Sequence, residues 1–305
     1  MKLLIITQKI DKNDPVLGFF HNWVRVFSEN YESVNVICLY KGEYDLPKNV
    51  RVFSLGKEKG ESKIKYILNF YKYIWRLRNE YNSVFVHMNQ EYILLAGFLW
   101  KIMNKNIYMW RNHHSGSMLT DIASMFCKKV FCTSKFSYTA KYRKTEIMPV
   151  GVDLENFKPN KNITRLPKSI LSIGRISPSK NIHILVDVIN KINDPSVKVV
   201  VYGDPIEKDK IYYEELKKKS SGLIEFHKGV PNIETIDLYS KYEIFINLSS
   251  SGMYDKTIFE AMACGCIVIA SNENLRGNIN DDLIFKNDDI SELENKIRKV
   301  LNYSE

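Results

Sequence analysis

Short apolar runs alternate with amphipathic stretches along the whole of this 305-residue chain. The runs are rich in β-branched residues, which is typical of buried strands in a parallel sheet, whereas the stretches between them have the period of helices. The candidate strands are residues 2–7, 33–39, 84–87, 107–110 and 129–132 in the first half, and 169–173, 197–202, 224–227, 244–247 and 267–271 in the second. This alternation predicts an α/β protein in which helices cover parallel sheets.

A segment rich in Pro, Gly and Asn separates the two halves. Residues 149–153 are Pro-Val-Gly-Val-Asp, and residues 157–162 are Phe-Lys-Pro-Asn-Lys-Asn. The length suits two domains of roughly 100–200 residues each, so we predict two Rossmann-like, doubly wound domains, residues 1–162 and 163–305. Since loops and helix N-termini gather at the carboxyl ends of such sheets, we expect the domains to face each other across a cleft lined by those ends.

One helical stretch, residues 62–80, is apolar on two sides. The stripe predicted to face the sheet consists of Ile64, Ile67, Leu68, Tyr71, Ile74 and Trp75. The second stripe lies opposite, with Lys65, Lys72 and Arg76 on its flank, and consists of Tyr66, Phe70, Tyr73 and Leu77. Its partner is either an anionic membrane surface, which this composition suits, or another part of the protein that buries the helix on both sides.

Composition narrows the class of protein. A content of 45% hydrophobic and 12% aromatic residues excludes a disordered chain. No apolar run approaches the ~20 residues of a membrane-spanning helix, and the N-terminus turns polar after one short strand, unlike a signal peptide. Five cysteines, with Cys264 and Cys266 in one tight connection, disfavour a disulfide framework. We therefore expect a cytoplasmic protein.

The chain is basic, with 44 Lys and Arg against 35 Asp and Glu and a net charge of +9. Such an excess suits nucleotide diphosphates, anionic lipid surfaces or nucleic acid. No block of five Lys or Arg and no recognition helix is present, so we expect no nucleic-acid partner.

Two cations follow the predicted strand 169–173. Gly174 and Arg175 come first, and Lys180 follows Ser177 and Pro178, which suit the N-cap and first position of a helix. Backbone N–H groups at a helix start, together with two cations, make a site for a doubly charged anion. The alternative is a pair of solvated cations on a loop.

A second candidate loop follows the strand 244–247. Its small residues let the backbone approach a ligand, Asp255 can cap the next helix, and Gly265 suits the position just after that helix. We expect Glu260 to lie on this helix and face the cleft, where its carboxylate could accept hydrogen bonds from two sugar hydroxyls. The alternative is a solvent-facing glutamate.

The helix and the following strand carry a resemblance. Residues 259–271, Phe-Glu-Ala-Met-Ala-Cys-Gly-Cys-Ile-Val-Ile-Ala-Ser, resemble the E-A-M-A-x-G-x-P-V-V-A-S motif of the family 4 retaining glycosyltransferases of GT-B fold. Matching pieces occur in the expected order at residues 149–153, 174–180, 201–204 and 228–230. The resemblance covers essentially the whole chain and is strongest in its second half. It implies hexosyl transfer, with retention, from a nucleotide-diphosphate sugar to a hydroxyl of a glycan or lipid-linked acceptor, in polysaccharide or glycolipid biosynthesis.

The resemblance also implies roles for single residues. Arg175 and Lys180 match the pair that holds the donor diphosphate, Glu260 the carboxylate that binds the ribose, and Val230 lies where the backbone contacts the base. His113 is our choice for the histidine near the transferred sugar, with His87 and His114 as runners-up. The catalytic set is therefore His113, Arg175 and Lys180, and the donor-binding set is Gly18, Gly174, Arg175, Lys180, Val230, Gly252, Met253, Tyr254, Asp255, Lys256, Thr257 and Glu260. We expect neither a metal nor another cofactor.

The chain departs from the family pattern at Gly252, where relatives usually carry a second glutamate that helps to hold the donor sugar. Asp255 either supplies that carboxylate or only caps the helix. Two other functions therefore stay open, a nucleotide-sugar epimerase of the same fold and a catalytically silent nucleotide-sugar-binding subunit. A peripheral position at the cytoplasmic membrane face, through the helix at 62–80, is a further expectation.

Overall fold

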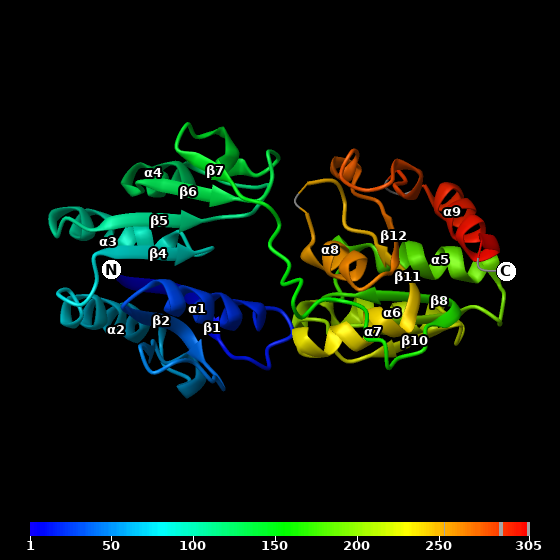
Figure 1. Cartoon of the computed structure of the whole chain (residues 1–305), viewed down its shortest axis with the longest axis horizontal. Coiled ribbons are helices and arrows are strands. Elements are labelled where there is room, and N and C mark those ends of the chain that lie inside the picture. Colours follow the sequence, from blue (N-terminus) through cyan, green and yellow to red (C-terminus); the bar gives the residue numbers. More distant parts are fainter. Residues whose placement is uncertain (253, 287–288, 304–305) are drawn as a thin grey trace. The chain divides into compact units, whose positions relative to one another are not determined.

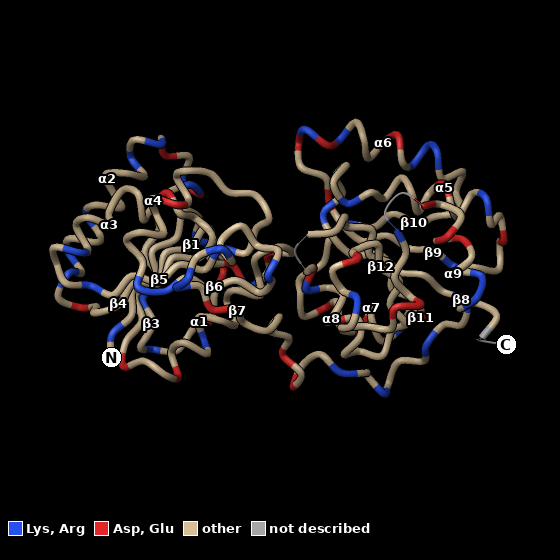
Figure 2. The backbone as a smooth tube through the Cα atoms, turned by 90° about the horizontal axis from the view of Figure 1, so that it is seen from above, with Lys and Arg blue, Asp and Glu red and all other residues tan. Residues whose placement is uncertain are grey.

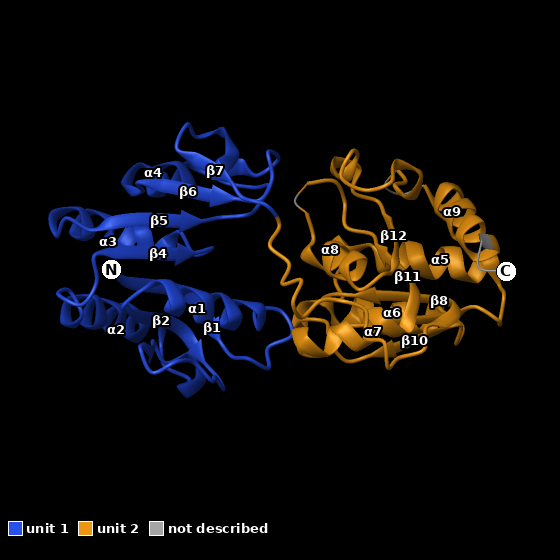
Figure 3. Cartoon of the chain, in the orientation of Figure 1, with its two compact units in different colours: residues 1–149 blue, residues 150–305 orange. Residues whose placement is uncertain are grey.

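The chain forms two compact units, residues 1–149 and 150–305, in the computed structural model (Figure 3). The structure describes residues 1–252, 254–286 and 289–303. Each unit contains one parallel β-sheet with helices on both faces, as the alternating pattern predicts (Figure 1). The fold is thus a pair of doubly wound α/β units.

The N-terminal unit is built on a seven-stranded sheet in the order β3-β2-β1-β4-β5-β6-β7. Its strands are β1 (Lys2–Ile10), β2 (Ser33–Lys41), β3 (Val50–Ser54), β4 (Ser83–His87), β5 (Asn106–Trp110), β6 (Lys129–Cys132) and β7 (Thr145–Ile147). The five predicted strands are confirmed. The two that the pattern missed, β3 and β7, are the edge strands, and neither contains a fully buried residue that would give an apolar run.

Three helices cover one face of this sheet, namely α2 (Lys63–Arg76), α3 (Glu91–Ile102) and α4 (Met118–Phe126), whereas α1 (Phe19–Asn30) lies on the other (Figure 2). Phe70 and Trp100 are fully buried beneath the three-helix layer, and Phe20 is buried beneath α1. Among the described helices, none is long and apolar enough to cross a membrane.

The structure reverses the two stripes predicted for α2. Phe70 and Leu77 of the second stripe are buried together with Ile74, and Tyr66 and Tyr73 pack against the same core. Of the six side chains predicted to face the sheet, only Ile74 is buried, and the other five are exposed: Ile64, Ile67, Leu68, Tyr71 and Trp75. The helix is apolar on two sides, so periodicity alone could not decide which side the sheet would bury.

The C-terminal unit is built on a five-stranded sheet in the order β10-β9-β8-β11-β12. Its strands are β8 (Leu166–Ile173), β9 (Lys198–Tyr202), β10 (Ile224–His227), β11 (Tyr242–Asn247) and β12 (Ile267–Ala270), and all five were predicted. The helices α5 (Ile182–Ile192), α6 (Lys210–Lys219) and α9 (Ile290–Tyr303) pack on one face, and α7 (Thr235–Lys241) and α8 (Lys256–Ala263) on the other.

The division between the units falls after Pro149, earlier than the predicted boundary at residue 162. The intervening segment packs on the C-terminal unit. Phe157 is buried in the core beneath α7 and α8, and the backbone N–H of Asn160 donates to Ser240 Oγ at 2.9 Å. These contacts explain why a Pro- and Asn-rich stretch behaves as part of a domain rather than as a linker.

The strand order reverses once in each sheet, between β1 and β4 and between β8 and β11. In doubly wound sheets, the loops that leave the carboxyl ends on either side of such a point diverge and leave a crevice for ligands. These two places are therefore where candidate site residues are sought.

His87 ends β4 at the first of these points and is buried, with 3% of its surface exposed. Its ring stacks on Phe20 at 4.1 Å between centroids, and its Nδ1 lies 3.2 Å from Thr7 Oγ1 on β1. Burial lowers the pKa of His87 to about 3. The imidazole is therefore neutral in the folded protein at neutral pH.

We expect His87 to make folding stability fall as the pH is lowered. Its ordinary pKa is 6.5, so between pH 6.5 and about 3 the unfolded chain binds a proton that the folded chain does not. Stability should fall by about 1.4 kcal/mol per pH unit from this group in that window. The free energy of unfolding, measured by urea unfolding from pH 7 to 5, should depend less steeply on pH in His87→Asn than in the wild type. This holds even if His87→Asn changes the stability at pH 7. His114→Asn is the matched control. An unchanged slope in His87→Asn would show that the ring is protonated in the fold.

Candidate functional site

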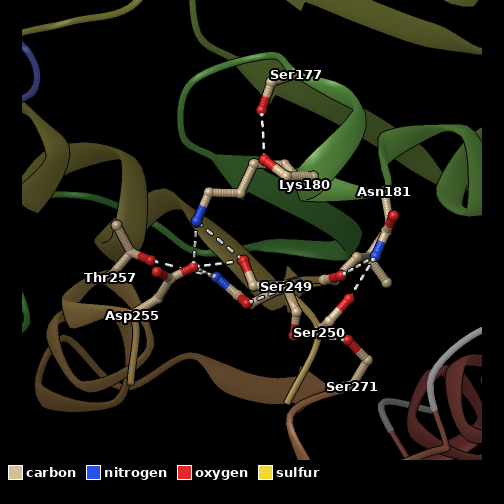
Figure 4. Close-up of polar contacts among 11 residues, drawn as sticks. Ser177, Lys180, Asn181, Ser249, Ser250, Asp255, Thr257 and Ser271 are labelled. Carbon is tan, nitrogen blue, oxygen red and sulfur yellow. Dashed lines mark hydrogen bonds and ion pairs between the residues drawn. The ribbon is translucent and has the colours of Figure 1, made fainter. Parts of the chain in front are cut away.

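The loops after β8 and β11 meet at the second reversal point (Figure 4). Lys180 lies on a single 3-10 turn, Pro178–Lys180, that follows β8, and Asp255 immediately precedes α8. The two residues are 75 positions apart in the sequence, yet Lys180 Nζ lies 2.6 Å from Asp255 Oδ2. The structure thus joins two predicted donor-site residues directly.

Neighbouring polar groups complete this cluster. Lys180 Nζ donates to Ser249 Oγ at 3.0 Å, and Ser249 Oγ donates to Asp255 Oδ2 at 2.5 Å. Asn247 Nδ2 donates to the same carboxylate oxygen at 3.0 Å and lies 3.5 Å from Thr257 Oγ1. The cluster therefore ties the ends of β8 and β11 to the start of α8.

The charges within the cluster are mutually stabilised. Burial by itself would raise the pKa of the Asp255 carboxyl, but the Lys180 ammonium and the hydrogen bonds from Ser249 and Asn247 outweigh burial and lower it. The side chains of Lys180 and Asp255 are each 28% exposed. The pair is thus ionised and remains partly open to a ligand.

The helix after β8 starts later than the sequence predicts. The turn at Pro178 is 3-10, and α5 begins only at Ile182, after Asn181 takes a left-handed φ of 52°. Ser177 does not cap the helix with its side chain, because Ser177 Oγ lies 3.0 Å from Ser179 Oγ instead. Lys180 consequently projects from a turn ahead of the helix and not from its first residues.

Asp255 occupies the N-cap position of α8, but its side chain makes no capping bond. The positive end of the α8 dipole therefore lies directly beside the Lys180–Asp255 cluster, where it favours an anion. At the C-terminus of α8, Gly265 forms the predicted cap. Gly265 takes a φ of +84°, its N–H donates to Met262 O, and the Cys266 N–H donates to Ala261 O.

Arg175 is exposed on the loop just after Gly174. That loop is held close to the next strand, because the Gly174 N–H donates to Tyr202 O at 3.0 Å. A Cβ at Gly203 would lie 1.9 Å from Gly174 O, so position 203 requires glycine for this approach. Arg175 is therefore a solvent-facing cation on a fixed loop beside the cluster's own strand, β8.

The Glu260 carboxylate is buried and does not face solvent. It is 1% exposed, with Oε1 accepting from Asn232 Nδ2 at 3.2 Å and Oε2 from the Tyr239 hydroxyl at 3.4 Å. Lys256 Nζ lies 3.4 Å from Oε1, one helical turn earlier. Burial, and next the Glu260 charge, raise the pKa of Tyr239 well above its usual value, so the phenol stays a donor to this carboxylate.

The remaining predicted donor residues surround α8 and the adjacent strand ends. The Gly252 carbonyl accepts from Asn274 Nδ2 at 3.0 Å, and the Tyr254 hydroxyl donates to Asn274 O at 3.1 Å. Val230 is half-buried beside Gly229, whose N–H donates to Asp204 Oδ2. Met253 lies outside the described residues.

The N-terminal unit holds the predicted Gly18 in the loop between β1 and α1. Asp14 organises this loop: Oδ1 accepts from the Val16 and Leu17 N–H groups, and Oδ2 lies 2.5 Å from Lys9 Nζ. A Cβ at Gly18 would lie 2.5 Å from Asp14 O. The loop's own packing therefore requires glycine there.

His113 is exposed on the loop after β5, where its Nδ1 accepts from the Ser115 N–H at 2.9 Å and its ring stacks on His114 at 4.6 Å. His87 is buried, so of the three candidates His113 and His114 present their rings to solvent.

The sequence gives no sign of two other unusual residues at the end of β4. Met88 takes a left-handed φ of 65°, a strained conformation that clusters at functional sites. The buried Gln90 leaves Oε1 without a hydrogen-bond partner among the described residues. Neither a backbone angle nor an unpaired oxygen has a sequence signal.

Within residues 1–252, 254–286 and 289–303, no group of three or more His, Cys, Asp or Glu side chains is arranged to hold a metal ion. Two ion pairs lie at the start of α8, Lys180 with Asp255 and Lys256 with Glu260, and Arg175 is an exposed cation on the loop after β8.

We expect Asp255→Asn to destabilise the C-terminal unit. Its lowered pKa means that the carboxylate's contribution is fully present at pH 7 and is lost only as the pH falls below the ordinary value of 3.8. The amide leaves the half-buried Lys180 ammonium without its counter-charge, at a cost of roughly 1–3 kcal/mol. Thermal melting at pH 7 measures the loss, with Glu215→Gln on α6 as the control for a surface carboxylate. Equal melting of the two variants would contradict the structural role of the pair.

Comparison with known proteins identifies the family of this chain. No curated protein matches the sequence. Crystal structures share the fold at low identity: Anabaena Alr3699/HepE in complex with UDP-glucose (TM-score 0.78, 15% identity, 100% of this chain and 91% of that chain) and sucrose-phosphate synthase from Thermosynechococcus elongatus (TM-score 0.77, 15% identity, 100% and 90%). The family described as "Glycosyl transferases group 1" matches residues 153–305, half of the chain. The chain belongs to the glycosyl transferases group 1 family.

Proposed function

We propose that this protein is a retaining, family 4 hexosyltransferase of GT-B type. It transfers a sugar from a nucleotide-diphosphate sugar to a hydroxyl of a glycan or lipid-linked acceptor, in polysaccharide or glycolipid synthesis. The bound UDP-glucose named for the Anabaena structure supports uridine diphosphate as the carrier. The family membership supports the reaction class.

The observation that carries the proposal is the convergence of Lys180 and Asp255 at the start of α8. Ser249 and Asp255 fix the position of the Lys180 ammonium, which keeps hydrogen-bonding capacity for an incoming anion. Arg175 adds a second cation from the loop after the same strand. Two cations and the positive end of the α8 dipole suit the diphosphate of a donor.

In the proposed reaction the bond between the anomeric carbon and the diphosphate oxygen breaks. Negative charge grows on the departing diphosphate, where Lys180, Arg175 and the start of α8 stabilise it more strongly than in the ground state. The acceptor oxygen forms its bond to the anomeric carbon on the face that the diphosphate leaves. Its proton passes to the leaving phosphate oxygen, so no separate base is required.

The other donor contacts follow from the same assignment. Val230 would meet the base, Glu260 the ribose, and the loop that includes Gly252, Tyr254 and Thr257 the sugar and phosphates. Because Glu260 is 1% exposed, it can reach a ribose only if a side chain that covers it moves aside. Asp255 is committed to Lys180, so we assign it to positioning that cation rather than to replacing the glutamate absent at position 252. Lys180 and Arg175 would supply the charge that a divalent ion supplies elsewhere, and we propose turnover without metal.

The donor site is tested by Arg175→Ala. The wild-type protein should be stabilised by a nucleotide-diphosphate sugar, by about 2.7 kcal/mol at a ligand concentration ~100 times its dissociation constant. The variant should lose roughly 2–4 kcal/mol of transition-state stabilisation, measured as kcat/KM for donor turnover in EDTA. Arg143→Ala, which removes an exposed arginine of the N-terminal unit, is the matched control.

Wild-type turnover in Arg175→Ala would contradict the diphosphate assignment. Loss of wild-type turnover in EDTA, restored by Mg²⁺, would contradict the metal-free proposal. Formation of an isomeric nucleotide sugar from donor alone would indicate the epimerase, and binding without transfer or hydrolysis would indicate the silent subunit.

His113 is tested by separating turnover from binding. Because its ring is proposed to touch the sugar and not the nucleotide, His113→Ala should lower kcat while the affinity for the nucleoside diphosphate, measured by calorimetry, stays at the wild-type value. His114→Ala is the control for loss of an exposed ring in the same loop. Full activity in His113→Ala together with lost activity in His114→Ala would move the role to the neighbouring histidine.

A further inference from the structure

Exposed apolar side chains concentrate on one helical layer of the N-terminal unit. Of the 24 large apolar side chains exposed among the described residues, 12 lie on α2, α3 and α4. They are Ile64, Ile67, Leu68, Tyr71, Trp75, Leu95, Phe98, Ile102, Met118, Leu119, Ile122 and Met125, and we call them the α2–α4 apolar face. Scattered exposed residues need no explanation, but such a concentration on one layer does.

The side chains of this face are exposed to solvent on three neighbouring helices. On α2 they follow the spacing i, i+3, i+4, i+7 and i+11, so they form one stripe that faces away from the buried Phe70 and Leu77. The Tyr71 hydroxyl donates to Leu95 O at 2.7 Å, which joins α2 to α3. A Cβ at Gly97 of α3 would lie 2.7 Å from the ring of Phe126, which shows how closely α4 approaches α3.

Cations lie along the α2 part of this face. Residues 62–79 contain five Lys and Arg and no Asp or Glu, and Lys63, Lys65, Lys72 and Arg76 are all exposed. The Arg78 guanidinium lies over the Trp75 ring at 4.7 Å, so an exposed indole carries its own cation. Among the acids of these helices, Asp121 is held by the hydroxyls of Tyr138 and Tyr142 and by Lys141.

We propose that the α2–α4 apolar face binds the surface of a membrane that contains anionic lipid. Apolar and aromatic side chains would enter the boundary between headgroups and acyl chains, and the Lys and Arg stems would lie along them with their charges at the phosphates. A second copy of this chain fits the face less well, because association through it would oppose the five cations of one α2 segment to those of the other. Charge complementarity therefore selects an anionic bilayer.

This inference concerns a surface separate from the donor site, and it stands or falls independently of the proposed reaction. It changes the membrane contact expected from the sequence: the buried Phe70 and Leu77 cannot reach lipid, whereas Trp75, Phe98 and Met125 can. The contact also extends over three helices rather than one.

Flotation of the full chain with phosphatidylcholine vesicles, with and without phosphatidylglycerol, tests the proposal. The protein should float with the anionic vesicles at ~0.1 M salt and much less at ~1 M, since the Debye length shrinks from about 10 Å to about 3 Å. Vesicles without phosphatidylglycerol should bind poorly. Each cation near the bilayer contributes about fivefold to binding, so Lys65/Lys72/Arg76→Glu should reduce it by about a hundredfold or more.

Two further variants separate the apolar contribution from the charge. Phe98→Ser/Ile102→Ser/Met125→Ser alters only exposed side chains and should also abolish flotation, while melting as the wild type does. The controls carry matched changes in the C-terminal unit, namely Lys161/Lys208/Lys218→Glu and Ile211→Ser, and should float normally. Nucleotide-sugar binding, measured by thermal shift on every variant, should be unchanged.

No flotation at low salt, or flotation that both α2–α4 variants leave intact, would overturn the proposal. A dimer in size-exclusion chromatography that the serine variant dissociates would overturn it too, because the face would then be occupied by a second copy. If the wild-type protein did not bind a nucleotide sugar, the proposed reaction would be contradicted but the membrane contact would not.

Discussion

The parallel pairing of β8 with β11 is the constraint on which the candidate donor site depends. These neighbours lie where the strand order reverses, so the chain leaves their carboxyl ends in loops that meet although they are far apart in sequence. The Lys180–Asp255 contact follows directly from this arrangement. The N-terminal sheet repeats it: β1 pairs with β4, and Thr7 contacts His87 across 80 positions.

In the cluster at β8 and β11, the Asp255 side chain forms an ion pair with Lys180 instead of capping α8. An aspartate at an N-cap usually satisfies the first N–H groups of its helix. The Asp255 side chain instead binds Lys180, Ser249 and Asn247, so it fixes the ammonium and does not cap α8. The ammonium is therefore held in a fixed place beside the positive end of the α8 dipole. Such an arrangement is organised before a ligand arrives, and this is what electrostatic stabilisation of a leaving group requires.

Sequence pattern predicted the buried features and missed those that depend on packing. Nine of the ten predicted strands contain two or more buried residues, and the tenth, β10, contains one, whereas the missed edge strands β3 and β7 contain none. The motif around Glu260 located the correct helix, but only the fold shows that Asn232 and Tyr239 enclose its carboxylate. Periodicity found both apolar stripes of α2 and assigned them to the wrong sides. The left-handed backbone of Met88 has no counterpart in composition or spacing.

The cations beside the α2–α4 apolar face have two physical effects that salt changes together. An exposed apolar face of this extent favours association with any apolar surface, including another copy of the chain. The five Lys and Arg of residues 62–79 oppose such self-association by like-charge repulsion and favour an anionic surface by attraction. Screening by salt weakens both effects, so high ionic strength removes the attraction to lipid and the protection against self-association at once. The same few charges therefore decide which surface the apolar side chains meet.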